Sequence, residues 1–158
     1  MNISYLKDRP ELVAQLIPGL LDHWRYVVPD DTGEARAARF RTHENHDAFP
    51  IAWVAHDDNI ALGTSALRVH DHPDRKDLSP WLGGMYVEPH ARRRGIGAAL
   101  VRVVEQKAVE LNVPRLHLFT HGQERFYTGL GWNYLEPTTW RGLNCTIMWK
   151  VPGAELSA

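Results

Sequence analysis

Hydrophobic residues in the first half of the chain change from helical to strand-like spacing. Apolar side chains recur every three or four positions from Leu12 to Trp24, which is typical of a helix with one buried face. Pro18-Gly19 interrupts this run, so we expect the helix to be kinked or split there. From residue 50 the apolar residues become continuous on both sides of a polar turn at residues 57–59, a pattern that predicts a hairpin.

The second half alternates short apolar runs with two helical segments. Residues 70–80 contain prolines, aspartates and histidines, and predict a loop. The adjacent glycines Gly83 and Gly84 indicate a bulge or a close backbone approach within the strand that follows. We predict one mixed α/β domain over residues 1–158. Its strands are expected at residues 3–6, 51–55, 60–69, 81–87, 115–120, 132–136 and 143–151, and its helices at residues 10–24, 32–45, 95–111 and 123–130.

Composition excludes several partners. The 158 residues carry a net charge of −1, so no overall positive field favours nucleic acid. Cys145 is the one cysteine, which excludes an internal disulfide and favours a reducing compartment. No apolar run approaches the roughly 20 residues that span a bilayer. We therefore expect a cytoplasmic protein without a membrane partner. Fourteen of the eighteen cations are arginines, and three of them are consecutive.

Those three arginines lie between a strand and a helix. The strand ends at Pro89, and two glycines two positions apart open the helix that follows the arginines. Free N–H groups and the positive end of a helix at such a turn favour an anion, and a pyrophosphate is its natural occupant. The alternative is an exposed basic turn. A dinucleotide-binding motif is disfavoured because the third glycine is missing, and no Gly-Lys-Ser/Thr follows for a P-loop. The segment comprises Arg92, Arg93, Arg94, Gly95, Ile96, Gly97 and Ala98.

A second segment follows one strand later, with the sequence Phe126-Tyr127-Thr128-Gly129-Leu130-Gly131-Trp132. Together with the Val-x-Pro at residues 87–89 and the Arg-x-x-Gly-x-Gly at residues 92–97, it resembles the GNAT superfamily of acyl-CoA N-acyltransferases. The resemblance implies the GNAT fold, with a central, mostly antiparallel, splayed sheet of six to seven strands flanked by about four helices. The specific motifs cover about residues 81–135.

The resemblance also implies how acetyl-CoA would bind. It would lie between the strand that ends at Val87 and the strand at residues 115–120, with the pyrophosphate on residues 92–98. Its pantetheine arm would pair with the backbone of Met85, Tyr86 and Val87. Tyr127 matches the tyrosine that faces the departing sulfur in many relatives, and a phenol can donate a proton or a hydrogen bond to a thiolate. Thr120 occupies the place where many relatives have an asparagine that contacts pantetheine.

The acceptor amine must lose a proton before it can attack, because an alkylamine is almost fully protonated at neutral pH. Many relatives use a glutamate or histidine that faces inward from the strand before the glycine turn. Residues 81–87 contain neither. The candidates nearby are Glu88 at the end of that strand, His121 after the next one, and residues 70–72 in the preceding loop. Among them we favour His121 or a water relay.

These features predict an N-acetyltransferase that moves acetyl from acetyl-CoA to a primary amine by direct attack in a ternary complex. Cys145 lies away from both motifs, so we expect no acyl-enzyme. The acceptor is a small metabolite, an antibiotic-like amine, a protein N-terminus or a lysine; Trp24, Tyr26 and His46 are candidates to line its pocket. The alternatives are a coenzyme A-binding sensor without turnover and an interaction module.

We expect no metal, since His70 and His72 lack a third partner and are interpreted as solvated loop residues. Late strands form dimers in many relatives, so a homodimer is a further expectation.

Overall fold

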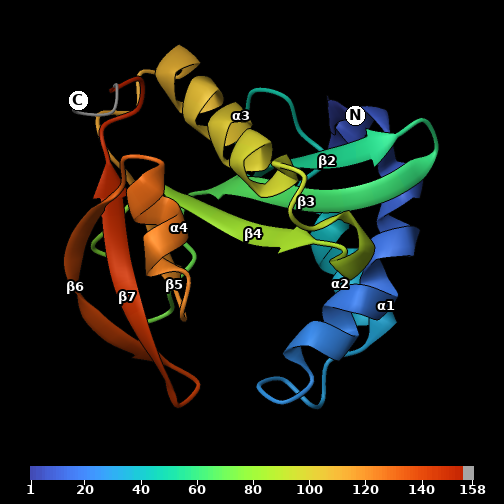
Figure 1. Cartoon of the computed structure of the whole chain (residues 1–158), viewed down its shortest axis with the longest axis horizontal. Helices are drawn as coiled ribbons and strands as arrows, with labels where there is room; N and C mark the ends of the chain where they lie inside the picture. The colour runs from blue at the N-terminus through green and yellow to red at the C-terminus, as the bar shows by residue number, and fades with distance from the viewer. Residues whose placement is uncertain (155–158) are drawn as a thin grey trace. The chain divides into compact units, whose positions relative to one another are not determined.

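The computed structural model describes residues 1–154, and residues 155–158 of the predicted domain lie outside the described residues. Within this range it contains seven strands and four α-helices, so the predicted mixed α/β class is confirmed. Figure 1 shows them in chain order: β1 Asn2–Tyr5, α1 Val13–Trp24, α2 Gly33–Arg41, β2 Ile51–Asp57, β3 Ile60–Arg68, β4 Trp81–Val87, α3 Ile96–Glu110, β5 Leu116–Thr120, α4 Glu124–Gly129, β6 Asn133–Trp140 and β7 Leu143–Lys150.

The described chain divides into two compact units. Unit 1 comprises Met1–Ala66 and Gly84–Val101, and unit 2 comprises Leu67–Gly83 and the described residues from Arg102 onward. The strands are hydrogen-bonded in the order β1-β2-β3-β4-β5-β7-β6. Unit 1 therefore contains β1, β2, nearly all of β3 and the second half of β4. Unit 2 contains the first half of β4 together with β5, β7 and β6. The single-domain prediction stays a prediction.

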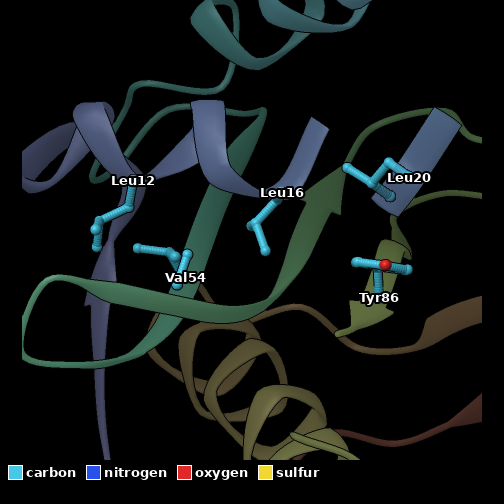
Figure 2. Close-up of a cluster of buried hydrophobic side chains, with 6 residues drawn as sticks. Leu12, Leu16, Leu20, Val54 and Tyr86 are labelled. Carbon is cyan, nitrogen blue, oxygen red and sulfur yellow. The ribbon is translucent and has the colours of Figure 1, made fainter. Parts of the chain in front are cut away.

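The core of unit 1 lies between α1 and the sheet. Figure 2 shows Leu12, Leu16 and Leu20 pointing from the α1 segment toward Val54 on β2 and Tyr86 on β4. Each of these side chains is at most 5% exposed. Spacings of four residues place the three leucines on one face of the helix, which explains why the helical pattern in the sequence is so regular.

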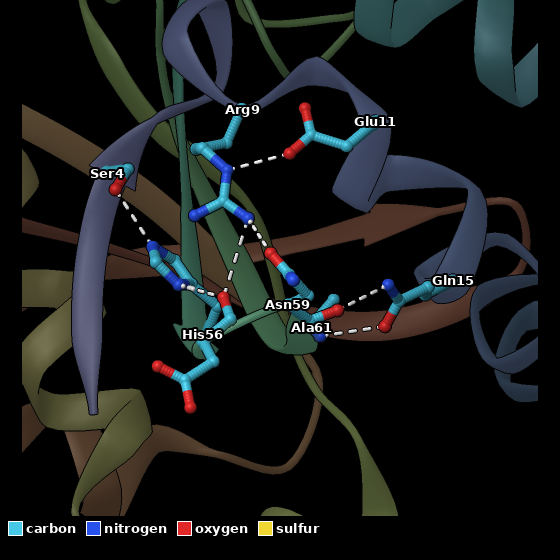
Figure 3. Close-up of polar contacts among 8 residues, drawn as sticks. Ser4, Arg9, Glu11, Gln15, His56, Asn59 and Ala61 are labelled. Atoms are coloured by element: carbon cyan, nitrogen blue, oxygen red, sulfur yellow. Dashed lines mark hydrogen bonds and ion pairs between the residues drawn. The ribbon is translucent and has the colours of Figure 1, made fainter.

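Polar contacts fix the start of α1 to the hairpin of β2 and β3 (Figure 3). The Gln15 side chain donates to the carbonyl of Asn59 at 2.7 Å and accepts from the N–H of Ala61 at 2.8 Å. Arg9 donates to the Asn59 side chain at 2.7 Å. Because the amide of Gln15 is used in both directions, it satisfies two backbone groups that the turn leaves open.

Pro18 does not split α1, so that part of the expectation is wrong, and the kink stays a prediction. The helix continues from Val13 to Trp24 with Pro18 inside it. Gly19 is needed for packing and not for a helix break, since a Cβ there would collide with the hydroxyl of Tyr86 and lie 3.0 Å from Glu88 Oε1. The glycine therefore allows the end of β4 to approach the helix backbone.

In unit 2, β5 pairs in parallel with β4 through Trp81 opposite His117 and in antiparallel with β7. β6 pairs with β7 and carries an irregularity between Tyr134 and Glu136. This strand continues to Trp140, beyond the predicted end at residue 136. Pro137 is tolerated inside it because β6 is last in the strand order, where one side of the backbone needs no partner.

Candidate active site

The second half of β4 directs its side chains to opposite faces of the sheet. Tyr86 packs under α1, whereas Met85 and Val87 pack in the cluster that includes the first turn of α3. The side chains of residues 85–87 are thus used in packing, and it is the strand's backbone that is left for a ligand. The carbonyl of Val87 already accepts a hydrogen bond from Arg92 Nε at 3.0 Å. The predicted pairing of pantetheine with this backbone stays a prediction.

The turn between β4 and α3 has the backbone geometry of an anion site. Arg93 has a φ of 62° and Gly95 a φ of 78°, with Arg94 at negative φ between them. Such alternation directs successive N–H groups to one side and forms a concave nest for an anion. The turn is exposed, and α3 begins immediately after it at Ile96. A Cβ on Gly95 would meet nothing within 4 Å, so the glycine is required by its conformation and not by lack of space.

The three arginine side chains have different surroundings. Arg92 is tied to β4, as described above. Arg94 pairs with Asp57 on β2 at 3.1 Å, and this hydrogen bond is the main reason why the pKa of Asp57 lies below its usual value. Arg93 forms no ion pair or hydrogen bond through its side chain within residues 1–154. Among the described residues, Arg93 is therefore the arginine of the three whose side chain makes no hydrogen bond or ion pair.

Tyr127 lies on α4 in unit 2 and is 7% exposed. Its ring contacts Phe126 at 4.9 Å and Trp132 at 6.2 Å between centroids, both edge to face. Burial, and then the negative charge of Asp71, raise the pKa of Tyr127 well above its usual value. Both causes disfavour the phenolate, so the hydroxyl carries its proton throughout the neutral pH range. It can act as a proton or hydrogen-bond donor.

Thr120 and His121 lie at the end of β5 in the same unit. Thr120 is 8% exposed and stands opposite Thr146 of β7. His121 is exposed, and its Nδ1 donates to the carbonyl of Asn144 at 2.8 Å. Within the described chain no hydrogen bond joins His121 to Tyr127. The structure thus fixes one nitrogen of this imidazole on the backbone of β7, and its predicted catalytic role stays a prediction.

Asp71 lies against β4, and its place there could not be read from its spacing in the sequence. A Cβ on Gly83 would lie 2.8 Å from Asp71 Oδ2 and 3.0 Å from its Cγ. The close backbone approach predicted from Gly83 is therefore confirmed, and the group that approaches is a carboxylate. Arg68 at the end of β3 holds the other oxygen, with 2.8 Å between Nη1 and Oδ1. The paired glycines were the signal for this contact, but they do not reveal which residue makes it.

The loop between β3 and β4 is also less solvated than predicted. His72 is 1% exposed, its Nδ1 accepts from the N–H of Asp74 at 3.1 Å, and its Nε2 lies 3.1 Å from the carbonyl of Thr139. The ring therefore carries its proton on Nε2 and donates to that carbonyl. Buried in this way, His72 fixes the loop to β6. No group of three or more potential metal ligands occurs among residues 1–154.

The three residues suggested for an acceptor pocket have separate surroundings in unit 1. Trp24 packs against the leucine cluster of α1, and Tyr26 is 66% exposed. His46 pairs with Asp8 at 2.8 Å and contacts the ring of Tyr5.

No helix in the described part of the chain is long and apolar enough to cross a bilayer.

A strand, an arginine- and glycine-containing turn and a long helix, followed by a buried tyrosine on a short helix, are typical of acyltransferases that use coenzyme A thioesters. The sequence model of the acetyltransferase (GNAT) family matches residues 15–132. The chain therefore belongs to the GNAT acetyltransferase family, as the resemblance of its motifs predicted.

Solved structures have the same fold over nearly their whole length. An aminoglycoside 6'-N-acetyltransferase complexed with coenzyme A is 20% identical, with a TM-score of 0.70 over 99% of this chain and 100% of that one. The ribosomal-protein-alanine N-acetyltransferase of Brucella melitensis is 17% identical, with a TM-score of 0.69 over 96% and 99%. The Salmonella typhimurium protein yncA, solved with acetyl-CoA, is 14% identical, with a TM-score of 0.70 over 100% and 97%.

Proposed function

We propose that this protein transfers acetyl from acetyl-CoA to a primary amine by direct attack within a ternary complex. The observation that carries the proposal is the nest formed at Arg93 and Gly95, at the start of α3. Its backbone N–H groups and the uncommitted Arg93 guanidinium suit the two charges of a pyrophosphate. Membership of the GNAT family supports this assignment, as do the coenzyme A and acetyl-CoA found in similar structures.

The reaction forms a bond from the amine nitrogen to the acetyl carbon and breaks the bond from that carbon to sulfur. Acetyl-CoA supplies an activated carbonyl and a thiolate leaving group. One proton leaves the nitrogen and one is added to the sulfur. The hydroxyl of Tyr127 is buried and holds its proton. Since its raised pKa makes it a weaker acid, it assists the second transfer first as a hydrogen-bond donor to the sulfur as negative charge develops there. A main-chain N–H near the end of β4 would polarise the carbonyl.

An amine acceptor is supported by the activities of two similar proteins. Aminoglycosides and ribosomal-protein alanine differ greatly in size, but in both cases the name describes acetylation at nitrogen. Primary amines as a class are therefore proposed, with no choice among them. We place the reaction in the cytoplasm, because Cys145 is a free, buried thiol and a reducing compartment suits it.

Binding is tested first, by calorimetry and thermal shift with acetyl-CoA, and turnover second, by thiol release. The acceptor panel contains simple alkylamines, aminoglycosides and peptides with a free N-terminal alanine. We expect acetyl-CoA to bind and at least one amine to release thiol. Binding without release from any amine would favour the sensor instead, and no binding at all would contradict the proposal.

The Tyr127→Phe variant tests the proton donor. We expect kcat to fall by about 10²-fold, the lower end of what general acid–base groups contribute, with the Kd for acetyl-CoA unchanged. Tyr134→Phe is the matched control, since that tyrosine is 62% exposed on β6. Equal activity of the two variants would remove Tyr127 from the reaction.

A further inference from the structure

The proposed reaction needs a group that receives the proton of the amine, and the strand before the anion turn carries none. Residues 81–87 of β4 include two glycines and no acidic, basic or histidine side chain. In unit 2, however, the space directly above Gly83 is taken by the ion pair of Asp71 and Arg68, whose Nη1 would lie 3.0 Å from a Cβ there. The distances from a Cβ at Gly83 would be 2.8 Å to Oδ2 and 3.0 Å to Cγ, which are shorter than ordinary carbon contacts. The loop thus supplies a carboxylate at the position where a side chain of β4 would stand.

The orientation of this carboxylate is fixed. Arg68 Nη1 lies 2.8 Å from Asp71 Oδ1, and the Asp71 side chain is 15% exposed. Since Oδ1 is engaged by the guanidinium, Oδ2 is the oxygen turned to β4. Packing of this pair against the strand requires a glycine at position 83. It also leaves Oδ2 as the carboxylate oxygen that the guanidinium does not hold in this ion pair.

The charge of Asp71 is also felt by Tyr127, the donor in the proposed transfer. Asp71 is the one charged group whose electrostatic effect on the Tyr127 hydroxyl is resolved among the described residues. An ionised carboxylate and a protonated phenol acting on one another are the pair that an amine acetylation needs, one to receive a proton and one to give it.

We propose that Asp71 is a catalytic residue, which binds the acceptor amine through Oδ2 and receives its proton. The assignment rests on the proposed function. The carboxylate attracts the ammonium form of the amine, takes one of its protons through Oδ2, directly or through one water, and passes that proton to solvent, which leaves the neutral amine able to attack. Once the nitrogen has bonded to the acetyl carbon, it loses a second proton by the same route. The departing sulfur receives one proton from Tyr127, which solvent restores, so the overall reaction releases one proton to solvent.

Two other groups compete for this role and are less well placed. Glu88 lies in unit 1 beneath α1, where its Oε1 would be 3.0 Å from a Cβ on Gly19, so the helix backbone covers it. Its charge acts on the neighbouring Tyr86, whose pKa is raised by burial and then by Glu88. His121 is exposed and has one nitrogen bound to the backbone of β7.

The test compares Asp71→Asn with Asp77→Asn and His121→Gln in the full-length chain. Asp77 is the control, because it lies in the same loop, also pairs with an arginine, and has a side chain 62% exposed. We expect Asp71→Asn to lower kcat/KM for a strongly basic alkylamine by about 10²-fold or more. A weakly basic amine, already neutral at the assay pH, should lose less. The Kd for acetyl-CoA and the melting temperature should stay at the wild-type values, as should every parameter of Asp77→Asn.

Moving the carboxylate from the loop to the strand gives a second, independent measurement. Gly83 has no positive φ, and once Asp71 is truncated the close neighbour that remains is Arg68 Nη1, 3.0 Å from a Cβ there, at the far end of a flexible side chain that can shift. We expect the double variant Gly83→Asp/Asp71→Ala to recover at least part of the activity that Asp71→Ala loses, with Arg68 now paired to the new carboxylate.

The outcomes separate the two proposals. If the wild-type protein releases no thiol with any amine, the proposed function fails. If the wild-type protein is active and Asp71→Asn retains its activity within about twofold, far below what a proton-accepting group contributes, only the role of Asp71 is overturned. A loss of activity that comes with weaker acetyl-CoA binding, a lower melting temperature or no recovery in the folded double variant would also overturn it. A loss confined to His121→Gln would return the role to the histidine.

Discussion

Replacing Gly63 by alanine would test how closely β3 and β4 pack behind the proposed pantetheine strand. In unit 1 a Cβ on Gly63 would lie 2.5 Å from the carbonyl oxygen of Tyr86, 3.3 Å from Val87 Cα and 3.1 Å from Leu100 Cδ1. The first distance is close to an ångström shorter than ordinary van der Waals contact, 3.4 Å. Two of the three neighbours are backbone atoms, which cannot rotate away. The strand itself must move.

The cost follows from two opposing effects. Overpacking of this kind typically destabilises a protein by about 1–3 kcal/mol. Alanine also restricts the unfolded chain, which returns about 0.4–1 kcal/mol. The net loss is about 1–2 kcal/mol, and for a protein of this size each kcal/mol lowers the melting temperature by roughly 2–4 °C. We therefore expect Gly63→Ala to melt about 2–8 °C below wild type. Acetyl-CoA should bind more weakly as well, since residues 86 and 87 are displaced.

The assay is a thermal or urea unfolding curve, with calorimetric titration of acetyl-CoA. Gly129→Ala is the matched control, because a Cβ on this last residue of α4 would meet nothing within 4 Å. Its stability should be unchanged or higher by up to about 1 kcal/mol, the difference between glycine and alanine in a helix. Equal melting temperatures for Gly63→Ala and the wild type would refute the close packing of β3 on Tyr86.

Three further predictions concern separate sites. Arg93→Ala should weaken acetyl-CoA binding by about 10-fold, the value of one charge-assisted hydrogen bond, whereas Arg41→Ala on the exposed end of α2 should not. Asp31 is mostly buried, which raises its pKa, but two arginines of α2 outweigh that burial and lower the pKa below its usual value. Asp31→Asn should therefore be less stable than wild type at neutral pH. In urea titrations the difference in free energy of unfolding should shrink as the pH falls below about 4. Lys150 donates to the carbonyl of Leu130 at 2.8 Å and pairs with the mostly buried Glu105. Lys150→Met should therefore lower the free energy of unfolding, measured in urea, by about 3–5 kcal/mol. Adding Glu105→Leu should restore part of that stability, because no unpaired charge then remains buried.

Hydrophobic spacing was sufficient to predict α1 and β2, because one face of α1 and both faces of β2 are buried. β2 is buried at six consecutive positions, and the first five of them form an unbroken apolar run in the sequence. Proline and glycine were less informative about where a helix or strand ends. Pro18-Gly19 has the composition of a helix break, but α1 continues through it because its leucine face is buried and Gly19 is needed for contact with Tyr86. β6 also continues through Pro137, which an outer strand tolerates.

Only the part of the site that consecutive residues form could be predicted from the sequence. The anion turn is local, so its glycines and arginines are adjacent in the sequence and their geometry follows from a few consecutive φ angles. His72 was expected in solvent, because nothing within the loop shows that the backbone of β6 lies over it. Asp71 was one of several candidates for the base for the same reason. Twelve positions separate it from Gly83, and their contact depends on how the loop folds back.

The position of Asp71 also bears on the choice between an enzyme and a sensor. The sensor interpretation depends on the missing carboxylate on β4, because a protein that has lost turnover can have a glycine where an active relative has its acidic residue. A glycine is equally what a strand requires when a carboxylate from a loop occupies the space of its side chain. The two cases differ in whether the space above the glycine is filled. At Gly83 it is filled by Asp71, held in place by Arg68, so the absence of an acidic residue on the strand is no longer a reason to expect a protein without turnover.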